Sequence, residues 1–504
     1  MAPPPASHPP LPLPPVARAR LLTTRPSTAV FLLLLGVYGY FYQAGGWNQN
    51  SRFDLVRAIV EQGTFSIDRY EANTGDDARR DGHYYCDKAP GASVLCLPPY
   101  WAMYRLAGAP DPVAPGWLAW AVWLSVVVAI GVPSALAAAC LARLCKQLGL
   151  GPSAATAVAL LWGLGTMALP YSTLLYGNQL SASLMLVAFL LFVEVRQGAY
   201  PSRSRMVIAG ALLGVAVATE YPAALIGVPI ALYGLAAAGL RPACFAALGG
   251  GVPVALLLAY HAVVFGGPLA FPYDFSVWET PRTGWFMGIG VPDVQALKNI
   301  LFGEYRGLFH TTPWLLAALP GGIALARRHG REAGVCVWSV LAFVWLNTSI
   351  PPWHGGWAAG PRYLVPMLPF LAILAGGVLL PPRDGHPDRS TATRRLATCV
   401  VLTALGLFSI ANMFAATAVK PEISTAEPRP YAEFVWPKFL AGDLAVSTQS
   451  IDAIDNPANG PRQAWNLGMK AGLDGHLSLV PLYLWTAVMC GWLVQLLVRE
   501  RRRQ

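Results

Sequence analysis

The run WLAWAVWLSVVVAIGVPSALAAACLAR, residues 117–143, contains no charged side chain before Arg143. An α-helix needs roughly 20 apolar residues to cross a bilayer, so this run predicts a transmembrane helix. Comparable runs lie at 27–43, 153–169, 177–195, 206–222, 224–240, 242–265, 308–326, 333–350, 361–380, 396–418 and 478–498. We therefore predict an all-α polytopic membrane protein with about 12 transmembrane helices.

The overall composition agrees with this class and excludes a soluble protein. Hydrophobic residues occupy 55% of the 504 positions and charged residues only 12%, whereas soluble domains carry about 25% charged residues. The net charge of +10 comes from basic residues spread among short loops between the apolar runs. Membrane topology produces that pattern, so we expect membrane lipids and no nucleic acid among the partners.

The basic residues also predict the orientation of the chain, because cytoplasmic loops are enriched in Lys and Arg. With the N-terminus inside, every short inner connection is basic, and so is the C-terminal stretch 499–503. The basic residues of these connections are Arg143, Lys146, Arg196, Arg203, Arg205, Arg241, Arg327, Arg328, Arg331, Arg383, Arg389, Arg394 and Arg395. We predict a multi-pass inner (cell) membrane protein with both termini in the cytoplasm.

This topology divides the chain into regions of different character. They are a disordered, Pro-rich cytoplasmic tail at 1–26, a transmembrane core at 27–418 with outer loops at 44–116 and 266–307, an outer loop or small cap at 419–477, and the last transmembrane helix with a basic cytoplasmic tail at 478–504. The Pro-rich tail lacks the apolar residues that a packed core requires.

The acidic residues gather on the predicted outer side. Of the 26 Asp and Glu residues, those on the inner side are Glu194, Glu332, Asp384, Asp388 and Glu500. A transporter usually places its ionisable groups near the middle of the bilayer. Acidic groups on an outer surface instead favour an enzyme whose active face is extracytoplasmic.

The first outer loop contains the densest polar stretch of the sequence. Between 51 and 62 the apolar residues Phe53, Leu55, Val56, Ile59 and Val60 recur at helical spacing, which predicts an amphipathic helix lying on the membrane surface. A second interfacial helix is expected at 93–106, where Trp and Tyr residues are frequent.

Four short motifs resemble those of a known superfamily. They are NSRF at 50–53, GTFSIDRY at 63–70, YCDKAP at 85–90 and GPRYLVPMLP at 360–369. They are similar to motifs of the GT-C superfamily of polyprenyl-phosphate-sugar-dependent glycosyltransferases, in the style of protein O-mannosyltransferases and lipid A aminoarabinose transferases. The resemblance implies a GT-C-like fold that moves a sugar from a polyprenyl-phosphate donor to an extracytoplasmic acceptor, which is a protein, a lipid or a glycan.

Such a transfer needs a base for the acceptor hydroxyl and cations for the departing phosphate. The superfamily places an acidic pair directly before the Arg-aromatic dipeptide, where this chain has the amides Gln49 and Asn50. Another outer carboxylate must then act as the base. The catalytic candidates are Asp68, Asp54, Asp87 and Glu220, and the donor phosphate candidates are Lys88, Arg362, Arg306 and Tyr363.

Simpler interpretations exist for several of these residues. Lys88 and Arg362 could anchor the chain at lipid headgroups, and Asp87 could pair only with Lys88. Asp68 could stabilise a turn, and Asp54 could form a surface ion pair with the neighbouring Arg57.

Metal and cofactor signals are weak. The sequence contains no DxD triplet and no CxxC or Cys/His ligand spacing, so we predict no structural zinc and name no cofactor. Dependence on a divalent metal stays open.

Two rival functions compete with the transferase. A transporter or flippase of lipid-linked saccharides would show two similar halves joined by a long cytoplasmic connection, whereas Arg241 is nearly the whole connection here. An inactive scaffold of the same fold would explain the amides Gln49 and Asn50.

Overall fold

The computed structural model describes residues 25–277, 288–382, 389–452 and 461–502. Most of the predicted tail, residues 1–24, lies outside the described residues. Helices form most of the described chain, and the strands are short: β1 (Phe41–Tyr42) pairs with β4 (Trp465–Asn466), and β2 (Asp77–Arg80) pairs with β3 (His83–Cys86), both antiparallel. The predicted helical class is confirmed.

Each predicted transmembrane run coincides with a helical segment. These are α1 (Arg25–Tyr38), α4 (Pro115–Val126) continuing through η3 (Val127–Gly131) into α5 (Val132–Gln147), α6 (Pro152–Leu164), α8 (Gly177–Arg196), α9 (Arg203–Thr219), η4 (Tyr221–Ala223) with α10 (Ala224–Ala238), α11 (Leu240–Phe265), η7 (Pro313–Ala317) with α14 (Ala318–Ala326), α15 (Gly330–Ser349), η8 (Arg362–Met367) with α16 (Leu368–Gly376) and η9 (Gly377–Leu379), α17 (Arg389–Val419) and α20 (Val480–Arg501).

Within the described ranges, 8 helical segments are long and apolar enough to cross a membrane. Three more apolar helices are shorter, at Arg25–Tyr38, Pro152–Leu164 and Pro313–Ala326. The chain is therefore a polytopic helical membrane protein, with fewer full-length spans than the roughly 12 expected from apolar length. Shortening occurs where Gly and Pro end a helix early, as Gly165 does at the end of α6.

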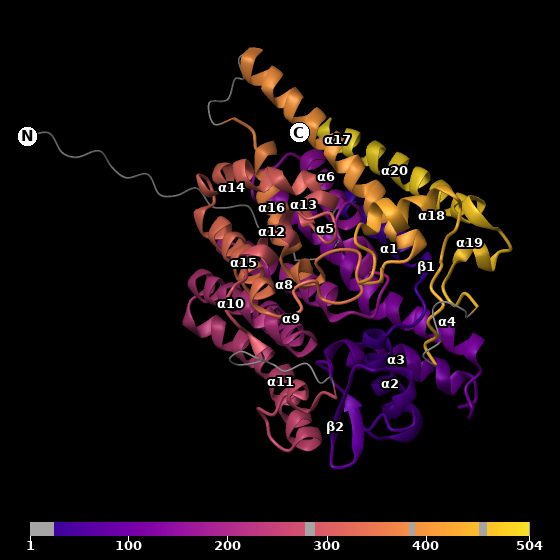
Figure 1. Cartoon of the computed structure of the whole chain (residues 1–504). Helices are drawn as coiled ribbons and strands as arrows, with labels where there is room; N and C mark the ends of the chain where they lie inside the picture. Colours follow the sequence, from indigo (N-terminus) through magenta and orange to yellow (C-terminus); the bar gives the residue numbers. More distant parts are fainter. Residues whose placement is uncertain (1–24, 278–287, 383–388, 453–460, 503–504) are drawn as a thin grey trace, which may run out of the picture.

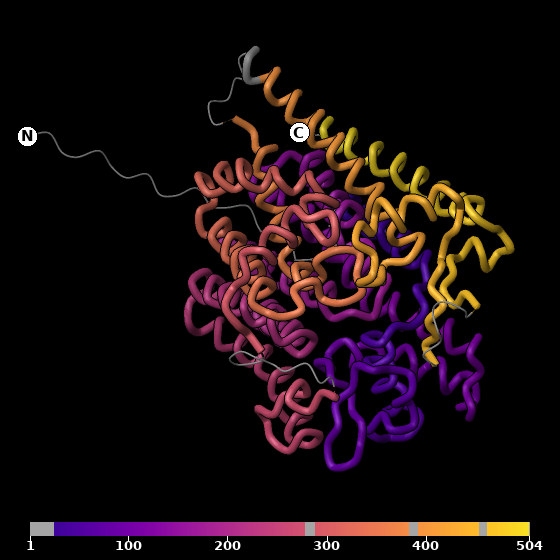
Figure 2. Tube along the Cα trace, viewed as in Figure 1, coloured from indigo at the N-terminus to yellow at the C-terminus, as the bar shows by residue number. Residues whose placement is uncertain are grey.

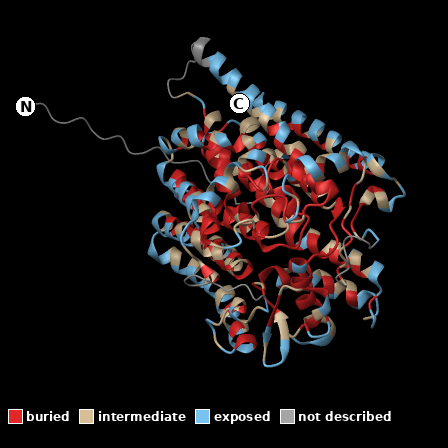
Figure 3. Cartoon of the chain, in the orientation of Figure 1, coloured by how far each residue is buried: buried red, intermediate tan, exposed pale blue. Residues whose placement is uncertain are grey.

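α8 is the most deeply buried of the long apolar helices, and Figure 3 shows that the buried residues gather in the middle of the molecule. Of the most apolar window of α8, 94% is buried inside the protein, against 17% for α11 and 28% for the α20 segment. Figure 1 shows α17 and α20 along one side of the molecule. The exposed residues of these outer helices are mostly apolar, such as Leu256 and Val488, which fits helices whose outer faces contact lipid.

Shorter elements connect the long helices at the end of the bundle that carries the predicted outer segments. They are α2 (Trp47–Arg57), η1 (Ala58–Gln62), η2 (Glu71–Asn73), α3 (Gly91–Leu106), η5 (Pro272–Phe275), α12 (Val294–Phe302), α13 (Leu308–Thr311), η10 (Pro430–Val435), α18 (Trp436–Leu440), α19 (Leu467–Lys470) and η11 (Gly475–Leu479), with α7 (Ala168–Tyr171) between α6 and α8.

The three predicted outer segments contact one another. The Gly45 N–H donates to the carbonyl of Gln449 at 3.1 Å, and a bridge joins Ala78 to Ser276. In Figure 2 the yellow C-terminal segment runs beside the indigo segment that follows α1, where β4 pairs with β1. The first loop, the middle loop and the C-terminal segment therefore assemble at one end of the bundle.

The first helix of this end differs from the expected surface helix. α2 begins at Trp47, earlier than predicted, and every residue from Asn48 to Arg57 is buried. The helix expected at 51–62 is therefore present in α2 and η1, and α2 packs inside the protein instead of presenting a polar face. The second predicted helix is present as α3, which exposes 53% of Trp101 and 88% of Leu106.

Candidate functional site

The buried helix α2 carries several residues of the candidate site. Asn50 fixes its start, because its side-chain amide donates to the carbonyls of Asn73 at 2.7 Å and Ser450 at 2.9 Å. The Gly46 N–H donates back to Asn50 Oδ1 at 3.1 Å. Asn50 therefore ties α2 to a later part of the first outer loop and to the C-terminal outer segment.

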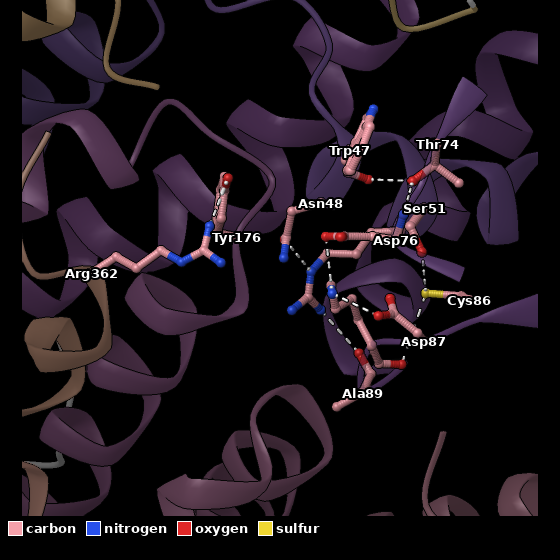
Figure 4. Close-up of polar contacts among 12 residues, drawn as sticks. Trp47, Asn48, Ser51, Thr74, Asp76, Cys86, Asp87, Ala89, Tyr176 and Arg362 are labelled. Atoms are coloured by element: carbon pink, nitrogen blue, oxygen red, sulfur yellow. Dashed lines mark hydrogen bonds and ion pairs between the residues drawn. The ribbon is translucent and has the colours of Figure 1, made fainter. Parts of the chain in front are cut away.

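Arg52 is the first buried cation on α2. Its side chain is 2% exposed and forms an ion pair with Glu220, with Nη2 and Oε1 2.8 Å apart. Its Nη1 donates to the carbonyl of Ala89 at 3.0 Å, and its Nε donates to Asn48 Oδ1 at 3.2 Å. All three nitrogen atoms have a partner, so the guanidinium holds a fixed orientation. Figure 4 places Asn48 and Ala89 in this network.

Lys88 lies beside two carboxylates. Its Nζ is 3.0 Å from Asp76 Oδ2 and 2.9 Å from Asp87 Oδ2. Burial opposes the charged form, but Asp76 and Asp87 together hold the pKa of Lys88 above its ordinary value. Burial also raises the pKa of Asp87, although Lys88 lowers it in part. Figure 4 shows Asp76 and Asp87 close together near Cys86.

We call these five residues the Arg52 group: Arg52, Lys88, Asp76, Asp87 and Glu220. Two cations face three carboxylates in it, and each carboxylate touches a cation. The group is therefore slightly acidic as a whole and offers no surplus positive charge to a further anion.

A second cluster lies around Glu422, directly after α17. Glu422 is buried, and its Oε2 accepts a hydrogen bond from Gln49 Nε2 at 2.9 Å. Its Oε1 accepts from the Tyr176 hydroxyl at 2.7 Å. Arg362, at the start of η8, donates from Nη1 to the same hydroxyl at 3.2 Å, and its guanidinium lies 5.2 Å from the centre of the Tyr176 ring.

Two further cations lie close to this cluster. Arg306 is 1% exposed, and its Nη2 donates to the carbonyl of Ile423 at 3.1 Å. Its Nε and Nη1 are buried without a hydrogen-bond partner in the described structure. Lys420 Nζ lies 4.8 Å from the centre of the Trp357 ring, and burial lowers the pKa of Lys420.

We call Arg306, Arg362, Lys420 and Glu422 the Glu422 group. It contains three cations and one carboxylate, and no ion pair of 4 Å or less links any of the cations to a carboxylate within the described residues. Buried cations without counter-ions are unfavourable unless an anion joins them. The Glu422 group therefore has the charge of an anion-binding site.

The two groups are neighbours at the start of α2. Gln49 contacts Glu422, and the adjacent Asn48 contacts Arg52. On the opposite side, a Cβ at Gly177 would lie 2.3 Å from Glu220 Oε1, while the preceding residue, Tyr176, touches Glu422. Figure 4 shows Asn48 between the Arg362–Tyr176 pair and the Asp76–Asp87 pair.

Most of the residues singled out in the sequence lie in these two groups. Asp87, Lys88 and Glu220 belong to the Arg52 group, and Arg306 and Arg362 belong to the Glu422 group. The Tyr363 ring centre lies 5.4 Å from the guanidinium of Arg362. These positions fit the expected roles and leave the roles themselves as proposals.

Asp54 and Asp68 lie outside both groups. Asp54 is fully buried beside Asn73, whose amide donates to it at 3.1 Å, and burial raises its pKa. It does not form the expected surface ion pair, because Arg57 pairs with Glu61 at 2.8 Å and with Asp452 instead.

Asp68 is 43% exposed and joins the turn before η2 to strand β3. It contacts His83 Nδ1 at 2.6 Å and accepts the Tyr84 N–H at 2.6 Å. Partial burial opposes ionisation, but these two bonds lower the pKa of Asp68. A turn-stabilising role agrees with this geometry.

Several site residues were not among the sequence candidates: Arg52, Asp76, Tyr176, Lys420 and Glu422. Arg52 could have been found as the only cation in the NSRF motif at 50–53. Glu422 gave no comparable signal, because its partner Gln49 is 373 positions away. Among the residues that the structure describes, no group of three His, Cys, Asp or Glu side chains could hold a metal ion.

Comparison with known proteins gives likenesses to solved structures, among them the following three. No protein-family model matches the sequence, and no curated protein matches it. The chain is similar to ArnT from Cupriavidus metallidurans in the apo state, with 18% identity, a TM-score of 0.46, and coverage of 94% of this chain and 75% of that one. ArnT bound to undecaprenyl phosphate gives 16% identity, the same TM-score of 0.46 and the same 94% and 75% coverage.

The third is the archaeal oligosaccharyltransferase AglB from Archaeoglobus fulgidus, in complex with an inhibitory peptide and a dolichol-phosphate. It gives 12% identity, a TM-score of 0.43, and coverage of 77% of this chain and 56% of that one. The assignment of function therefore rests on the geometry of this chain's own residues.

Proposed function

We propose that this protein is a membrane glycosyltransferase that moves a sugar from a polyprenyl-phosphate donor to an acceptor on the extracytoplasmic side. The observation that carries the proposal is the surplus of buried positive charge in the Glu422 group, next to the carboxylates of the Arg52 group. An apolar helical bundle with such a site at one end suits a substrate that combines a lipid tail, a phosphate and a sugar.

The Glu422 group is the proposed site of the donor phosphate. Arg306 has two buried N–H groups without a hydrogen-bond partner in the described chain, and phosphate oxygens would satisfy them. Arg362 is only half-buried, beside the likewise half-buried Tyr363, so both are within reach of a ligand. As the carbon–phosphate oxygen bond breaks, charge grows on the phosphate, and these cations would stabilise it.

Lys88 is proposed as an additional contact to the donor from the Arg52 group. Its two carboxylate partners already neutralise it, so its contribution is weaker than that of Arg306 or Arg362. Asp87 and Glu220, which are the sequence candidates that lie in this group, would shape the acceptor side. Asp54 and Asp68 have no place in the proposed reaction, because each makes its contacts elsewhere.

The test is a transfer assay with the full-length protein in lipid nanodiscs. Undecaprenyl phosphate carrying radiolabelled hexoses or pentoses would be supplied with a membrane extract as the source of acceptors. We expect transfer by the wild type and strong losses in Arg362→Ala and Arg306→Ala, with a smaller loss in Lys88→Ala. Arg429→Ala serves as the control, because Arg429 forms an exposed pair with Glu433 on the C-terminal outer segment.

The rival functions give different outcomes in the same preparation. Binding of undecaprenyl phosphate without transfer from any donor would contradict the transferase and favour a flippase or an inactive scaffold. Movement of a fluorescent lipid-linked sugar between the leaflets of reconstituted vesicles would then separate a flippase from a scaffold.

A further inference from the structure

Glu422 differs from the other carboxylates of the site because it touches no cation. Asp76 and Asp87 contact Lys88, and Glu220 contacts Arg52, each within 3.0 Å. Glu422 is instead held by two neutral donors, Gln49 and Tyr176. Within the described residues, no Lys or Arg nitrogen forms an ion pair with it.

This difference affects how readily each carboxylate accepts a proton. A cation in contact stabilises the charged form of a carboxylate and makes it a weaker base. Burial raises the pKa of Glu422, while the bond from Tyr176 and the nearby charges of Lys420 and Arg362 lower it in part. A base whose pKa lies nearer to neutral pH is the more effective proton acceptor.

Tyr176 links Glu422 to the exposed side of the site. Its hydroxyl donates to Glu422 Oε1 at 2.7 Å and accepts from Arg362 Nη1 at 3.2 Å. Tyr176 and Glu422 are buried, whereas Arg362 is half-buried. Arg362, whose contact with the Tyr176 hydroxyl is drawn in Figure 4, is therefore the least buried of these three residues.

We propose that Tyr176 and Glu422 form the proton relay that activates the acceptor hydroxyl. The inference rests on the proposed glycosyl transfer and names the base of that reaction. The acceptor hydroxyl passes its proton to the Tyr176 oxygen, and the phenolic proton of Tyr176 moves to Glu422 at the same time. The guanidinium of Arg362 stabilises negative charge on the phenolic oxygen during this exchange.

The bonds and charges of the step balance without a further reactant. The acceptor oxygen forms a bond to the anomeric carbon of the sugar, and the bond between that carbon and the phosphate oxygen breaks. The polyprenyl phosphate leaves with the electron pair of the broken bond. Glu422 ends with the proton, which it returns to water after the products depart.

A purely structural role for Glu422 makes different predictions. In that case Glu422 would only tie the end of α17 to α2 through Gln49. Gln in place of Glu422 keeps the size of the side chain and an oxygen for the Tyr176 hydroxyl, so Glu422→Gln would retain activity. Under the relay, the amide cannot take the proton and activity is lost.

The experiment measures transfer from radiolabelled undecaprenyl-phosphate sugar by Glu422→Gln, Tyr176→Phe and the double variant. We expect kcat to fall by about 10²–10⁴-fold in each single variant, with little change in KM for the donor. The double variant should be no slower than the slower single variant, because the two residues act as one unit. Glu422→Asp should recover part of the lost rate.

Two matched variants serve as controls: Glu433→Gln, an exposed Glu in the same outer segment, and Tyr483→Phe, an exposed Tyr on α20. Both should keep the wild-type rate. The pH profile adds a second readout, since the acidic limb of kcat should disappear in Glu422→Gln. The titratable or charged groups that face Glu422 are Tyr176, Arg362 and Lys420.

Failure of the relay and failure of the proposed function are distinguishable. Transfer by the wild type together with an unchanged kcat in Glu422→Gln, or losses that multiply in the double variant, would overturn the relay alone. Absence of transfer by the wild type with every donor would overturn both.

Discussion

Arg52 in α2 and Glu220 at the end of α9 form an ion pair of 2.8 Å although 168 positions separate them in the chain. The Arg52 side chain is 2% exposed and that of Glu220 is 15% exposed. The pair therefore joins the first outer loop to the transmembrane core where little water can screen the charges. Opposite charges so placed stabilise each other, and either one alone would be strongly unfavourable.

Removal of one member of this pair should destabilise the protein markedly. Arg52→Met leaves the Glu220 carboxylate without its cation, and Glu220→Met leaves the Arg52 guanidinium without its anion. Breaking a buried pair costs about 3–5 kcal/mol, so each variant should unfold at a clearly lower temperature in detergent. The double variant should lose much less than the sum of the two single losses. Additive losses would show that the residues act independently.

Asp77 in β2 should make stability depend on pH in the mildly acidic range. Burial, together with the neighbouring charge of Asp87, raises the pKa of Asp77 to about 6, and its Oδ1 has no hydrogen-bond partner among the described residues. The folded protein therefore binds this proton more tightly than the unfolded chain does. Its contribution to stability is complete below the ordinary Asp pKa and is lost as the pH rises through about 6.

Asp77→Asn removes that loss, because the amide does not ionise. The difference in melting temperature between Asp77→Asn and the wild type should grow in favour of the variant from pH 4 to pH 7. Asp474→Asn, at an exposed position, is the control for an Asp-to-Asn change away from the site. A constant difference for Asp77→Asn would contradict the prediction.

The positions of the helices could be predicted because apolar length is a local property of the sequence. The run at 117–143 became the continuous helix Pro115–Gln147, and the run at 177–195 became α8. The basic residues at the helix ends bear on the orientation of the chain, which stays a prediction. What apolar length could not predict is where a helix would stop early, as α6 does at Gly165.

Only those residues of the candidate site that stand in short sequence motifs could be predicted. Lys88 and Arg362 stand in motifs and do lie in the site, whereas Asp68 stands in a motif and pairs with His83 on the surface. A position close to α2 in the sequence does not reveal whether a side chain will lie in the site or on the surface. The burial of α2 depends on contacts such as Gly45 with Gln449, which join distant segments and leave no periodic signal.

Close packing between α9 and α11 should make Gly210 intolerant of a larger residue. A Cβ at Gly210 would lie 1.8 Å from the carbonyl oxygen of Ala246 in α11, so Gly210→Ala must push the two helices apart. We expect a loss of about 1–3 kcal/mol, as for other overpacked interiors, seen as a lower melting temperature.

Gly251→Ala on α11 is the matched control, because nothing lies within 4 Å of a Cβ there. Ala also has the higher helix propensity, so this variant should be neutral or slightly more stable. Equal melting temperatures for Gly210→Ala and Gly251→Ala would show that the two helices are not packed as closely as described.

Binding of the carrier phosphate should depend on Arg306 before any chemistry occurs. Arg306 is buried, and two of its nitrogen atoms have no hydrogen-bond partner in the described chain, so a phosphate gains more from this side chain than from a solvated one. Undecaprenyl phosphate at 100 times its dissociation constant should stabilise the wild type by about 2.7 kcal/mol. Arg306→Met should lose nearly all of this thermal shift, while Arg429→Met, at the exposed pair with Glu433, should keep it. An undiminished shift in Arg306→Met would remove the Glu422 group from consideration as the phosphate site, since the unpartnered N–H groups of Arg306 are the strongest sign that an anion belongs there.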